Sequence, residues 1–302
     1  MRALVLKAYG SVEQLEQRDI AEPRLSPGEV LVQVSATSVN PIDWKLRSGS
    51  LSAMLPLDFP AVLGRDVAGV VLAKGPGVTA LQTGDRVLGL VEHAYAERVV
   101  ASVDAFTRLP EGLELCDAAA LPLVLLTGAQ LIDEAVRPVR GQTVLVTGAL
   151  GSVGRVAVFV ARRHGARVFA GVRASQRAQA EGLGCERVVA LDDDADLATL
   201  RELDAIADTV GHETIARLLP SLRVGGTLGS VVGEPPAAVG KGFTVRAMWA
   251  HPDAARLGEL ALAVARGELI VPIAKRLPLA QGAEAQRLAE QGGLGGKVLL
   301  LM

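Results

Sequence analysis

A glycine-rich segment between Gly148 and Gly154 follows the apolar run Val144–Val146 and leads into a stretch with helical periodicity. Glycines in such a turn let the backbone approach a pyrophosphate closely, and the following helix offers unpaired N–H groups and the positive end of its dipole. A glycine motif alone is a weak signal, but a strand before it and a helix after it make it far more specific. The segment therefore predicts a dinucleotide-binding turn, with a tight turn that binds no ligand as the alternative.

The residues of this turn have different expected roles. In the fingerprint Gly-x-Gly-x-x-Gly, Ala149 stands in the place of the first glycine, while Gly151 and Gly154 keep the second and third places. We expect the backbone of Gly151, Ser152, Val153 and Gly154 to contact the cofactor.

The residues after the next strand predict which dinucleotide is bound. An acid about 20 residues further on would bind the ribose hydroxyl of NAD, but Arg155–Ala180 contains neither Asp nor Glu. Arg173 ends the strand and Arg177 follows it, and arginines hold a phosphate that an acid would repel. The pattern predicts NADPH; the alternative is that both arginines only solvate a helix face.

The elements that position this turn follow from the alternation of apolar runs with turn residues. Strands are expected at Thr143–Thr147, Arg167–Val172, Arg187–Leu191, Leu203–Thr209 and Thr227–Val232, with helices between them. Strand–helix alternation of this length predicts an α/β fold with a Rossmann, doubly wound parallel sheet, which we place at residues 117–242. Short β runs dominate the first third, so residues 1–116 are expected to form a β-rich domain, joined by 243–302.

Composition limits the classes of partner. The 302 residues carry a net charge of −2, which gives no electrostatic reason to expect nucleic acid or an anionic membrane surface. We expect no membrane span, because the richest apolar run, Ala118–Leu126, is too short and contains Pro122. The two cysteines, Cys116 and Cys185, are far apart and fit neither a disulfide framework nor a metal site, so a cytoplasmic location is expected.

Several segments together resemble the zinc-independent quinone oxidoreductases of the medium-chain dehydrogenase/reductase superfamily. They are Val39–Gly49, Leu63–Val71, Gly84–Val87, Ala94–Glu97, Ala118–Pro122, the glycine turn, Asp208–Gly211 and Gly296–Leu299, and they occur in the order of the family. The family's turn usually reads Ala-x-Gly-Gly-Val-Gly, so Ala149 is expected there and Ser152 is the departure.

The resemblance implies a GroES-like first domain, a Rossmann domain, a cofactor cleft between them, and a homodimer. It also implies NADPH-dependent reduction of quinones or of α,β-unsaturated ketones and aldehydes. Zinc enzymes of the same superfamily need a cysteine and a Gly-His-Glu motif where this chain has Asn40 and Gly64-Arg65-Asp66. We therefore expect no metal site.

Two residues are the candidates for catalysis. Negative charge develops on the substrate oxygen during reduction, so without zinc either protein donors or water must stabilise it. The resemblance places Asn40 beside the nicotinamide and substrate, and a lysine at position 45 is typical of relatives that reduce enones. The alternatives are a turn residue before Pro41 for Asn40 and a solvated side chain for Lys45.

The predicted cofactor site has further members outside the turn. Thr127 matches a family threonine near the nicotinamide, although its hydroxyl could instead cap a helix. Val232, Gly233 and Lys297 complete the expected set. The loops Leu51–Phe59 and Glu234–Lys241 are expected to shape the substrate pocket. The rival hypothesis from another class is an NADPH-binding regulatory or structural protein with little turnover.

Overall fold

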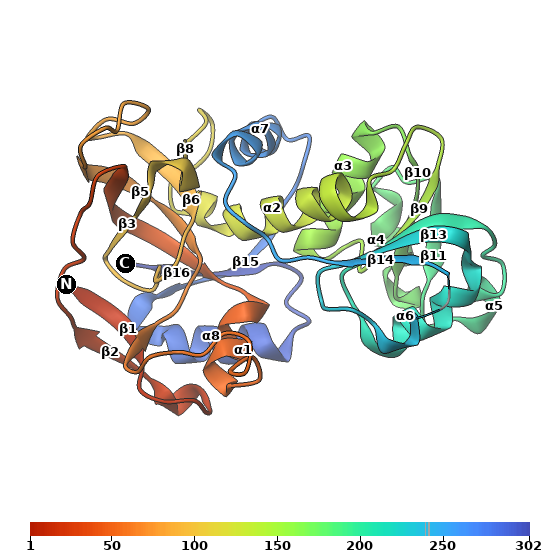
Figure 1. The fold of residues 1–302 in the computed structure, drawn as a ribbon, viewed down its shortest axis with the longest axis horizontal. Coiled ribbons are helices and arrows are strands. Elements are labelled where there is room, and N and C mark those ends of the chain that lie inside the picture. The colour runs from red at the N-terminus through yellow and green to blue at the C-terminus, as the bar shows by residue number, and fades with distance from the viewer. Residues whose placement is uncertain (239, 241) are drawn as a thin grey trace. The chain divides into compact units, whose positions relative to one another are not determined.

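The computed structural model describes residues 1–238, 240 and 242–302, and Val239 and Lys241 of the expected pocket loop lie outside them (Figure 1). It contains two compact units, one made of Met1–Leu123 with Pro252–Met302 and the other of Val124–His251. The segment 243–251, which we expected in the first domain, therefore lies in the second unit. The reason is strand β14 (Thr244–Ala247), which pairs in parallel with β13 (Leu222–Ser230).

The first unit is built on two sheets. One has the strand order β2-β1-β4, and the other has the order β15-β16-β3-β5-β6-β8, with β7 also pairing with β3. The strands are β1 (Arg2–Leu6), β2 (Leu15–Asp19), β3 (Glu29–Val39), β4 (Ala61–Val62), β5 (Asp66–Lys74), β6 (Arg86–Leu90), β7 (Arg98–Ser102), β8 (Phe106–Arg108), β15 (Ile273–Pro278) and β16 (Lys297–Leu301). Burial alternates along most of β3, as expected for a strand with one face on the core.

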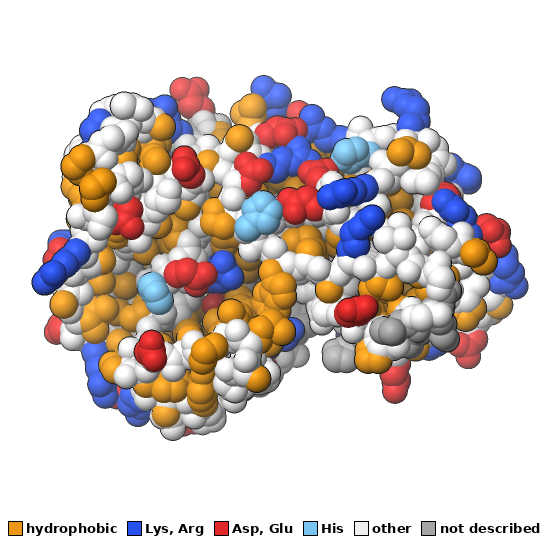
Figure 2. Space-filling model, viewed as in Figure 1, with side chains coloured by type: hydrophobic (Ala, Val, Ile, Leu, Met, Phe, Trp, Pro, Cys, Tyr) orange, Lys and Arg blue, Asp and Glu red, His pale blue; other side chains and the backbone are white. Residues whose placement is uncertain are grey.

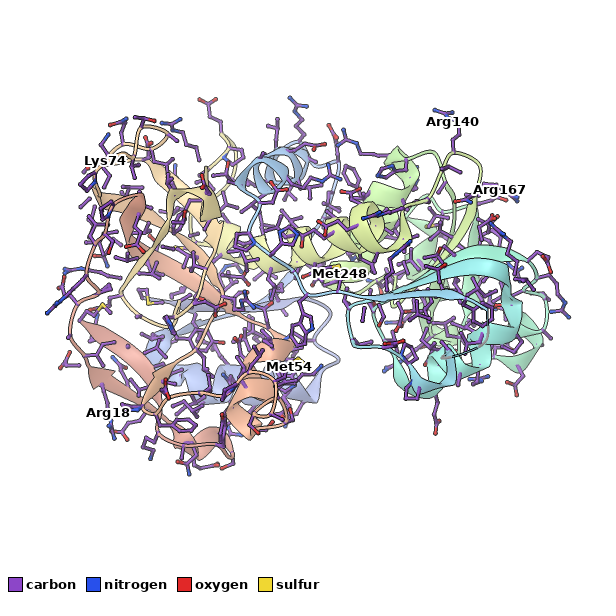
Figure 3. The ribbon with its side chains drawn as sticks, in the orientation of Figure 1. Arg18, Met54, Lys74, Arg140, Arg167 and Met248 are labelled. Atoms are coloured by element: carbon purple, nitrogen blue, oxygen red, sulfur yellow. The ribbon has the colours of Figure 1, made fainter. Side chains whose placement is uncertain are left out.

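Helices α1 (Pro41–Ser48), α7 (Ala254–Ala265) and α8 (Gly282–Gln291) complete the first unit, in which valines from β3, β5 and β6 form one core cluster. A second cluster joins Leu4, Leu6, Tyr95, Val298 and Leu300. The loop that follows α1 carries exposed apolar side chains, including Met54, which is 63% exposed (Figure 3).

The second unit is a six-stranded sheet in the order β11-β10-β9-β12-β13-β14, and every neighbouring pair is parallel. Its further strands are β9 (Thr143–Thr147), β10 (Arg167–Val172), β11 (Arg187–Ala190) and β12 (Leu203–Asp208), and its helices α3 (Ser152–Arg163), α4 (Arg177–Glu181), α5 (Asp194–Leu197) and α6 (His212–Leu218). Leu228 packs in one cluster with Ile215 of α6, whereas its neighbour Gly229 faces Val136. Because successive strand residues point to opposite faces, both faces of the sheet are covered.

An apolar helical run at Asp117–Val136 corrects one expectation. It comprises a 3-10 turn (Asp117–Ala120), α2 (Pro122–Gln130) and a π-helical segment (Leu131–Val136). By length and composition this run is sufficient to cross a membrane, so our estimate that the apolar stretch is too short was wrong. Its most apolar window is 78% buried inside the fold, as is typical of a core helix.

Charged side chains of both signs are interspersed over the surface. Figure 2 shows basic and acidic groups side by side on the visible face of each unit. Many of them form exposed ion pairs, such as Arg167 with Glu186 and Arg276 with Asp117. This distribution agrees with the small net charge of the sequence.

Candidate functional site

The glycine turn has the close backbone packing that its sequence predicts. A Cβ atom added at Gly154 would lie 2.1 Å from the carbonyl oxygen of Gly148, which leaves space only for glycine. Gly148 itself has a φ of 62°, and a Cβ there would lie 2.7 Å from Thr209 Oγ1. Gly148, which the fingerprint left without a role, therefore makes the tight turn.

Helix α3 begins inside this turn with its first N–H groups uncapped. Gly151 is the N-cap residue and has no side chain to cap the helix, and no acid lies in the first turn. The first helical bond joins Arg155 N to Gly151 O at 2.9 Å. The N–H groups of Ser152, Val153 and Gly154 therefore precede the helical ladder, and such groups bind anions.

The turn lies where the order of the strands reverses. β9 and β12 are neighbours, yet the chain proceeds from β9 outward to β10 and from β12 outward to β13. Open parallel sheets bind ligands outside the carboxyl ends of the strands at such a point. Val232 and Gly233 follow the carboxyl end of β13, so the structure brings these two candidates to the same edge as the turn.

The two candidate arginines differ in their surroundings. Arg177 pairs with Asp196, whereas Arg173 is exposed and its side chain has no hydrogen bond or ion pair within the described part of the chain. The backbone N–H of Ala174 donates to Asp192 Oδ1 at 2.7 Å. Acids from the segment after β11 therefore lie beside the arginines, which the acid-free stretch Arg155–Ala180 did not predict.

Thr127 lies inside α2 rather than at its start, so its hydroxyl is not a helix N-cap. It is half-buried. The next residue, Gly128, packs against α3: a Cβ there would lie 2.5 Å from Cβ of Val156. This contact holds α2 close to the helix that begins at the glycine turn.

In the first unit, the Asn40 side chain joins a buried acid to a buried lysine. Asn40 is 1% exposed, and its Nδ2 donates to Asp66 Oδ2 at 2.7 Å while its Oδ1 accepts from Lys297 Nζ at 2.5 Å. Lys297 Nζ also donates to Val39 O at 3.1 Å and lies 3.7 Å from Asp66 Oδ2. Burial lowers the pKa of Lys297, and the charge of Asp66 opposes that shift.

The Asp66 carboxyl group is fully buried and connects three segments. It accepts hydrogen bonds from Ser38 Oγ and Asn40 Nδ2 at Oδ2, and from Leu123 N at Oδ1, 2.6 Å away. Leu123 lies in the first turn of α2, where a carboxylate also interacts favourably with the helix dipole.

Asp43 is a second buried carboxyl group close to Asn40. Its Oδ2 accepts from Asn40 N at 2.7 Å and from Tyr95 Oη at 2.8 Å, whereas its Oδ1 has no hydrogen-bond partner in the described chain. Burial raises the pKa of Asp43 to about 7. Burial and the neighbouring Asp43 both raise the pKa of Tyr95, so the phenol remains the donor of this pair.

Lys45 lies on α1, two residues after Asp43, and is half-buried. Its ammonium group makes no hydrogen bond or ion pair with the residues that the structure describes. Arg65, in contrast, pairs with Glu92 at 2.9 Å. Lys45 is therefore the cation of this region that remains available to a ligand.

The structure thus groups the sequence candidates into two sets. One set lies at the carboxyl edge of the second unit's sheet and consists of Gly151, Ser152, Val153, Gly154, Arg173, Val232 and Gly233. Asn40 and Lys297 are in direct contact in the interior of the first unit. Sequence reasoning missed Asp66 and Asp208 as site residues, although both lie in motifs that carried the resemblance.

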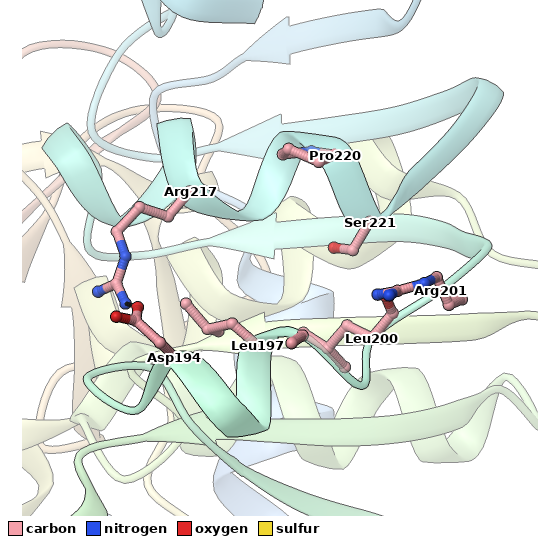
Figure 4. Close-up of a pocket in the computed structure, with 8 residues that line it drawn as sticks. Asp194, Leu197, Leu200, Arg201, Arg217, Pro220 and Ser221 are labelled. Atoms are coloured by element: carbon pink, nitrogen blue, oxygen red, sulfur yellow. Dashed lines mark hydrogen bonds and ion pairs between the residues drawn. The ribbon is translucent and has the colours of Figure 1, made fainter.

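The described residues contain no candidate metal cluster, and a surface pocket lies in the second unit. Within residues 1–238, 240 and 242–302, no group of three or more His, Cys, Asp or Glu side chains is placed to hold a metal. A surface pocket of about 370 Å³ lies between α5 and α6, lined by Arg201, Arg217, Asp194 and Ser221 among others (Figure 4). Its polar side chains are engaged within the chain, Arg217 with Asp194 and Ser221 with Leu218 O.

Two protein families match this chain. The Alcohol dehydrogenase GroES-like domain family matches residues 26–111, and the Zinc-binding dehydrogenase family matches residues 183–300. Among curated proteins, the chloroplastic quinone-oxidoreductase homolog of Spinacia oleracea is 32% identical over 199 residues. That match covers 63% of this chain and 60% of the relative, so it spans less than two thirds of the relative's length.

Solved structures match over the whole chain. The quinone oxidoreductase from Coxiella burnetii has a TM-score of 0.89 at 28% identity and covers 100% of this chain and 99% of its own. A mycobacterial quinone oxidoreductase has a TM-score of 0.83 at 30% identity, with 100% of both chains covered. A mycobacterial protein solved in complex with NADPH has a TM-score of 0.84 at 29% identity, again over 100% of both chains.

The matches agree with the folds of both units, one GroES-like and one Rossmann. On this basis the chain belongs to the quinone oxidoreductase-like family of the medium-chain dehydrogenase/reductase superfamily.

Proposed function

We propose that this protein is a zinc-independent, NADPH-dependent oxidoreductase that reduces a quinone or an α,β-unsaturated carbonyl compound. The observation that carries the proposal is the uncapped N-terminus of α3, which begins at a turn where only glycine fits, beside the switch point between β9 and β12. This combination supplies N–H donors and a positive dipole to a pyrophosphate. Ser152, Val153 and Gly154 would hold it there.

The choice of NADPH over NADH rests mainly on Arg173. This side chain is exposed and without a partner in the described chain, whereas Arg177 is engaged by Asp196. A guanidinium binds a phosphate with charge-assisted hydrogen bonds, and a free one loses no existing ion pair in doing so. The mycobacterial relative solved with NADPH supports the same cofactor.

The bound cofactor supplies a hydride, and the chain's own residues must then stabilise charge on the substrate oxygen. We assign this donor role to Lys45, whose ammonium has no partner among the described residues. Asn40 is the second candidate, because one of its two Nδ2 hydrogens has only long contacts with Ser38, 3.4 Å to O and 3.5 Å to Oγ. Thr127, Val232 and Gly233 are proposed to contact the cofactor.

Zinc independence is supported by the groups around Asn40. Lys297 places a buried ammonium against Asn40 Oδ1 and near Asp66, and a divalent cation at this position would be repelled by it. Arg65 stands where the zinc enzymes have the histidine of their Gly-His-Glu motif. Its guanidinium pairs with Glu92 and cannot ligate a metal.

Parallel assays of NADPH consumption with quinones and enones test the proposal, with identification of the products. A saturated carbon–carbon bond indicates an enone reductase, and one-electron products indicate quinone chemistry. Cofactor binding without oxidation across the panel would favour the regulatory alternative. We expect Asn40→Ala and Lys45→Ala to lower turnover while the Kd for NADPH changes little, with the exposed Lys275→Ala as the matched control.

We also propose that the protein is a cytoplasmic homodimer with no nucleic-acid or membrane partner. The family resemblance supports the dimer. The net charge of −2 and the interspersed charges on the face drawn in Figure 2 support the absence of a nucleic-acid or anionic-membrane partner. Light scattering coupled to size-exclusion chromatography gives the number of subunits.

A further inference from the structure

Asp208 ends β12 directly at the switch point of the parallel sheet. Its side chain is 0% exposed. Its carboxyl group accepts four hydrogen bonds: from Thr147 Oγ1 at 2.9 Å, Val210 N at 3.0 Å, Gly211 N at 2.9 Å and Ser230 Oγ at 3.0 Å. These donors come from the ends of three strands, β9, β12 and β13.

The two hydroxyl groups extend these bonds into the loops that follow the strands. Thr147 Oγ1 accepts from Thr209 N at 2.9 Å, so its own proton is directed to Asp208. Ser230 Oγ accepts from Val232 N at 3.2 Å in the same way. Asp208 is therefore connected to the glycine turn after β9, to its own loop at Thr209–Gly211, and to the loop of Val232.

All four donors to Asp208 are neutral groups. No salt bridge to Asp208 occurs in the part of the chain that the structure describes, which contrasts with Asp66 and its neighbour Lys297. A buried acid without a cation is costly, and apolar side chains would fill the same space with less loss of solvation. The benefit that offsets the cost of burying Asp208 must come from its hydrogen bonds, which fix the positions of three loops relative to one another.

We propose that Asp208 is a positioning residue that sets the spacing of the three loops that receive the dinucleotide. The inference rests on the proposed cofactor site at the glycine turn and names the group that shapes it. Asp208 acts through its partners: Thr147 fixes the strand end from which Gly148 turns, and Ser230 fixes Val232.

The test compares substitutions at Thr147. Thr147→Val keeps the shape of a β-branched strand residue but removes the donor to Asp208 and the acceptor for Thr209 N, whereas Thr147→Ser retains the hydroxyl. Thr37→Val is the matched control, because Thr37 is equally buried in a strand, β3, and its hydroxyl has no hydrogen-bond partner in the described chain. The Kd for NADPH and the melting temperature are measured for each variant.

We expect Thr147→Val to weaken NADPH binding about tenfold, because the two hydrogen bonds that it removes no longer position the glycine turn against the loop of Thr209. Thr147→Ser and Thr37→Val should stay within about twofold of the wild-type Kd. Equal affinities of Thr147→Val and Thr147→Ser for NADPH would overturn the proposed role of Asp208 but would not contradict the dinucleotide site at the glycine turn. A wild-type protein that binds neither NADPH nor NADH would instead remove the proposed function and this inference with it.

Ser230→Ala provides a second measurement that does not depend on the folding of Thr147→Val. It removes one donor from Oδ2 of Asp208 and frees Val232 N, while the bonds at Oδ1 stay intact. We expect a several-fold weaker Kd, together with a melting temperature lowered by a few degrees because a buried hydrogen bond is lost. A wild-type Kd in a folded Ser230→Ala protein would contradict the role of Asp208.

Discussion

Lys297 Nζ lies 2.5 Å from Oδ1 of Asn40, while Nδ2 of the same amide donates to Asp66 Oδ2 at 2.7 Å. An ammonium only donates and a carboxylate only accepts, so the two charges fix which way the Asn40 amide points. The family resemblance places the Asn40 amide beside the substrate. In the structure, the buried ion pair of Lys297 and Asp66 determines the orientation of this amide.

Lys297→Met should destabilise the protein by about 3–5 kcal/mol, because it leaves Asp66 buried without a cation. Asp66→Asn in the Lys297→Met background should recover part of this loss by removing the uncompensated charge. Urea denaturation gives the free energy of unfolding. Lys275→Met, on the exposed side of β15, is the control, and equal stability of both lysine variants would contradict the prediction.

Arg173→Ala should weaken NADPH binding roughly 10- to 100-fold, the effect of about 1.5–3 kcal/mol from a charge-assisted hydrogen bond. NADH binding should change little, because NADH lacks the phosphate. Arg177→Ala should have the smaller effect on NADPH, since Asp196 already engages that guanidinium. Titration of both cofactors into each variant separates these outcomes. An equal loss for NADPH and NADH in Arg173→Ala would exclude a phosphate contact.

Gly154→Ala should damage the dinucleotide site most directly. The added methyl group would lie 2.1 Å from Gly148 O, so the start of α3 must move away from the turn. We expect a loss of about 1–3 kcal/mol in stability from overpacking, together with weaker NADPH binding. Gly182→Ala is the control, because its new Cβ would meet only Gln179 O at 3.7 Å. Wild-type NADPH affinity in a folded Gly154→Ala protein would argue against this site.

The pH dependence of stability should report on Asp43. Burial raises its pKa from 3.8 to about 7, so the folded protein holds this proton more tightly than the unfolded chain. Its contribution to stability is therefore complete below about pH 3.8 and declines until about pH 7, by on the order of 4 kcal/mol in total. Asp43→Asn should flatten the free energy of unfolding over this range.

Tyr95→Phe should act on Asp43 in the opposite sense. The Tyr95 hydroxyl donates to Asp43 Oδ2 and so favours the carboxylate, which means that its removal raises the pKa of Asp43 further. The decline in stability should then extend to higher pH than in the wild-type protein. Identical pH profiles for wild type and Asp43→Asn would show that another group controls this range.

Much of the fold could be predicted because its strands carry clear apolar patterns. Thr143–Thr147 and Arg167–Val172 are strands with the expected bounds. β2 escaped prediction because four of its five residues are exposed and polar, so it has no hydrophobic periodicity. The segment 243–251 was assigned to the wrong unit, since sequence does not reveal that β14 pairs with β13.

The candidate site was less accessible to sequence reasoning, because its partners are distant in the chain. Asn40 meets Lys297 across 257 positions, and Thr147 meets Asp208 across 61. Arg177 looked like a phosphate ligand until folding brought Asp196 to it from 19 positions away. Local motifs indicated the turn and its ligand class, but not which charges are already engaged.

The wide turn at Leu131–Val136 determines which side of the apolar run meets the sheet. Arg137 N bonds to Ile132 O, five residues back, so this turn holds one residue more than an α-helical turn. This turn places the side chains of Leu131, Ala135 and Val136 against Gly229 of β13. Deleting one residue here would restore an ordinary α-helix but rotate everything before it by about 100° relative to the strand, because each residue advances a helix by that angle. The extra residue thus determines how the apolar run before it is rotated about the helix axis, and so which of its side chains face the sheet.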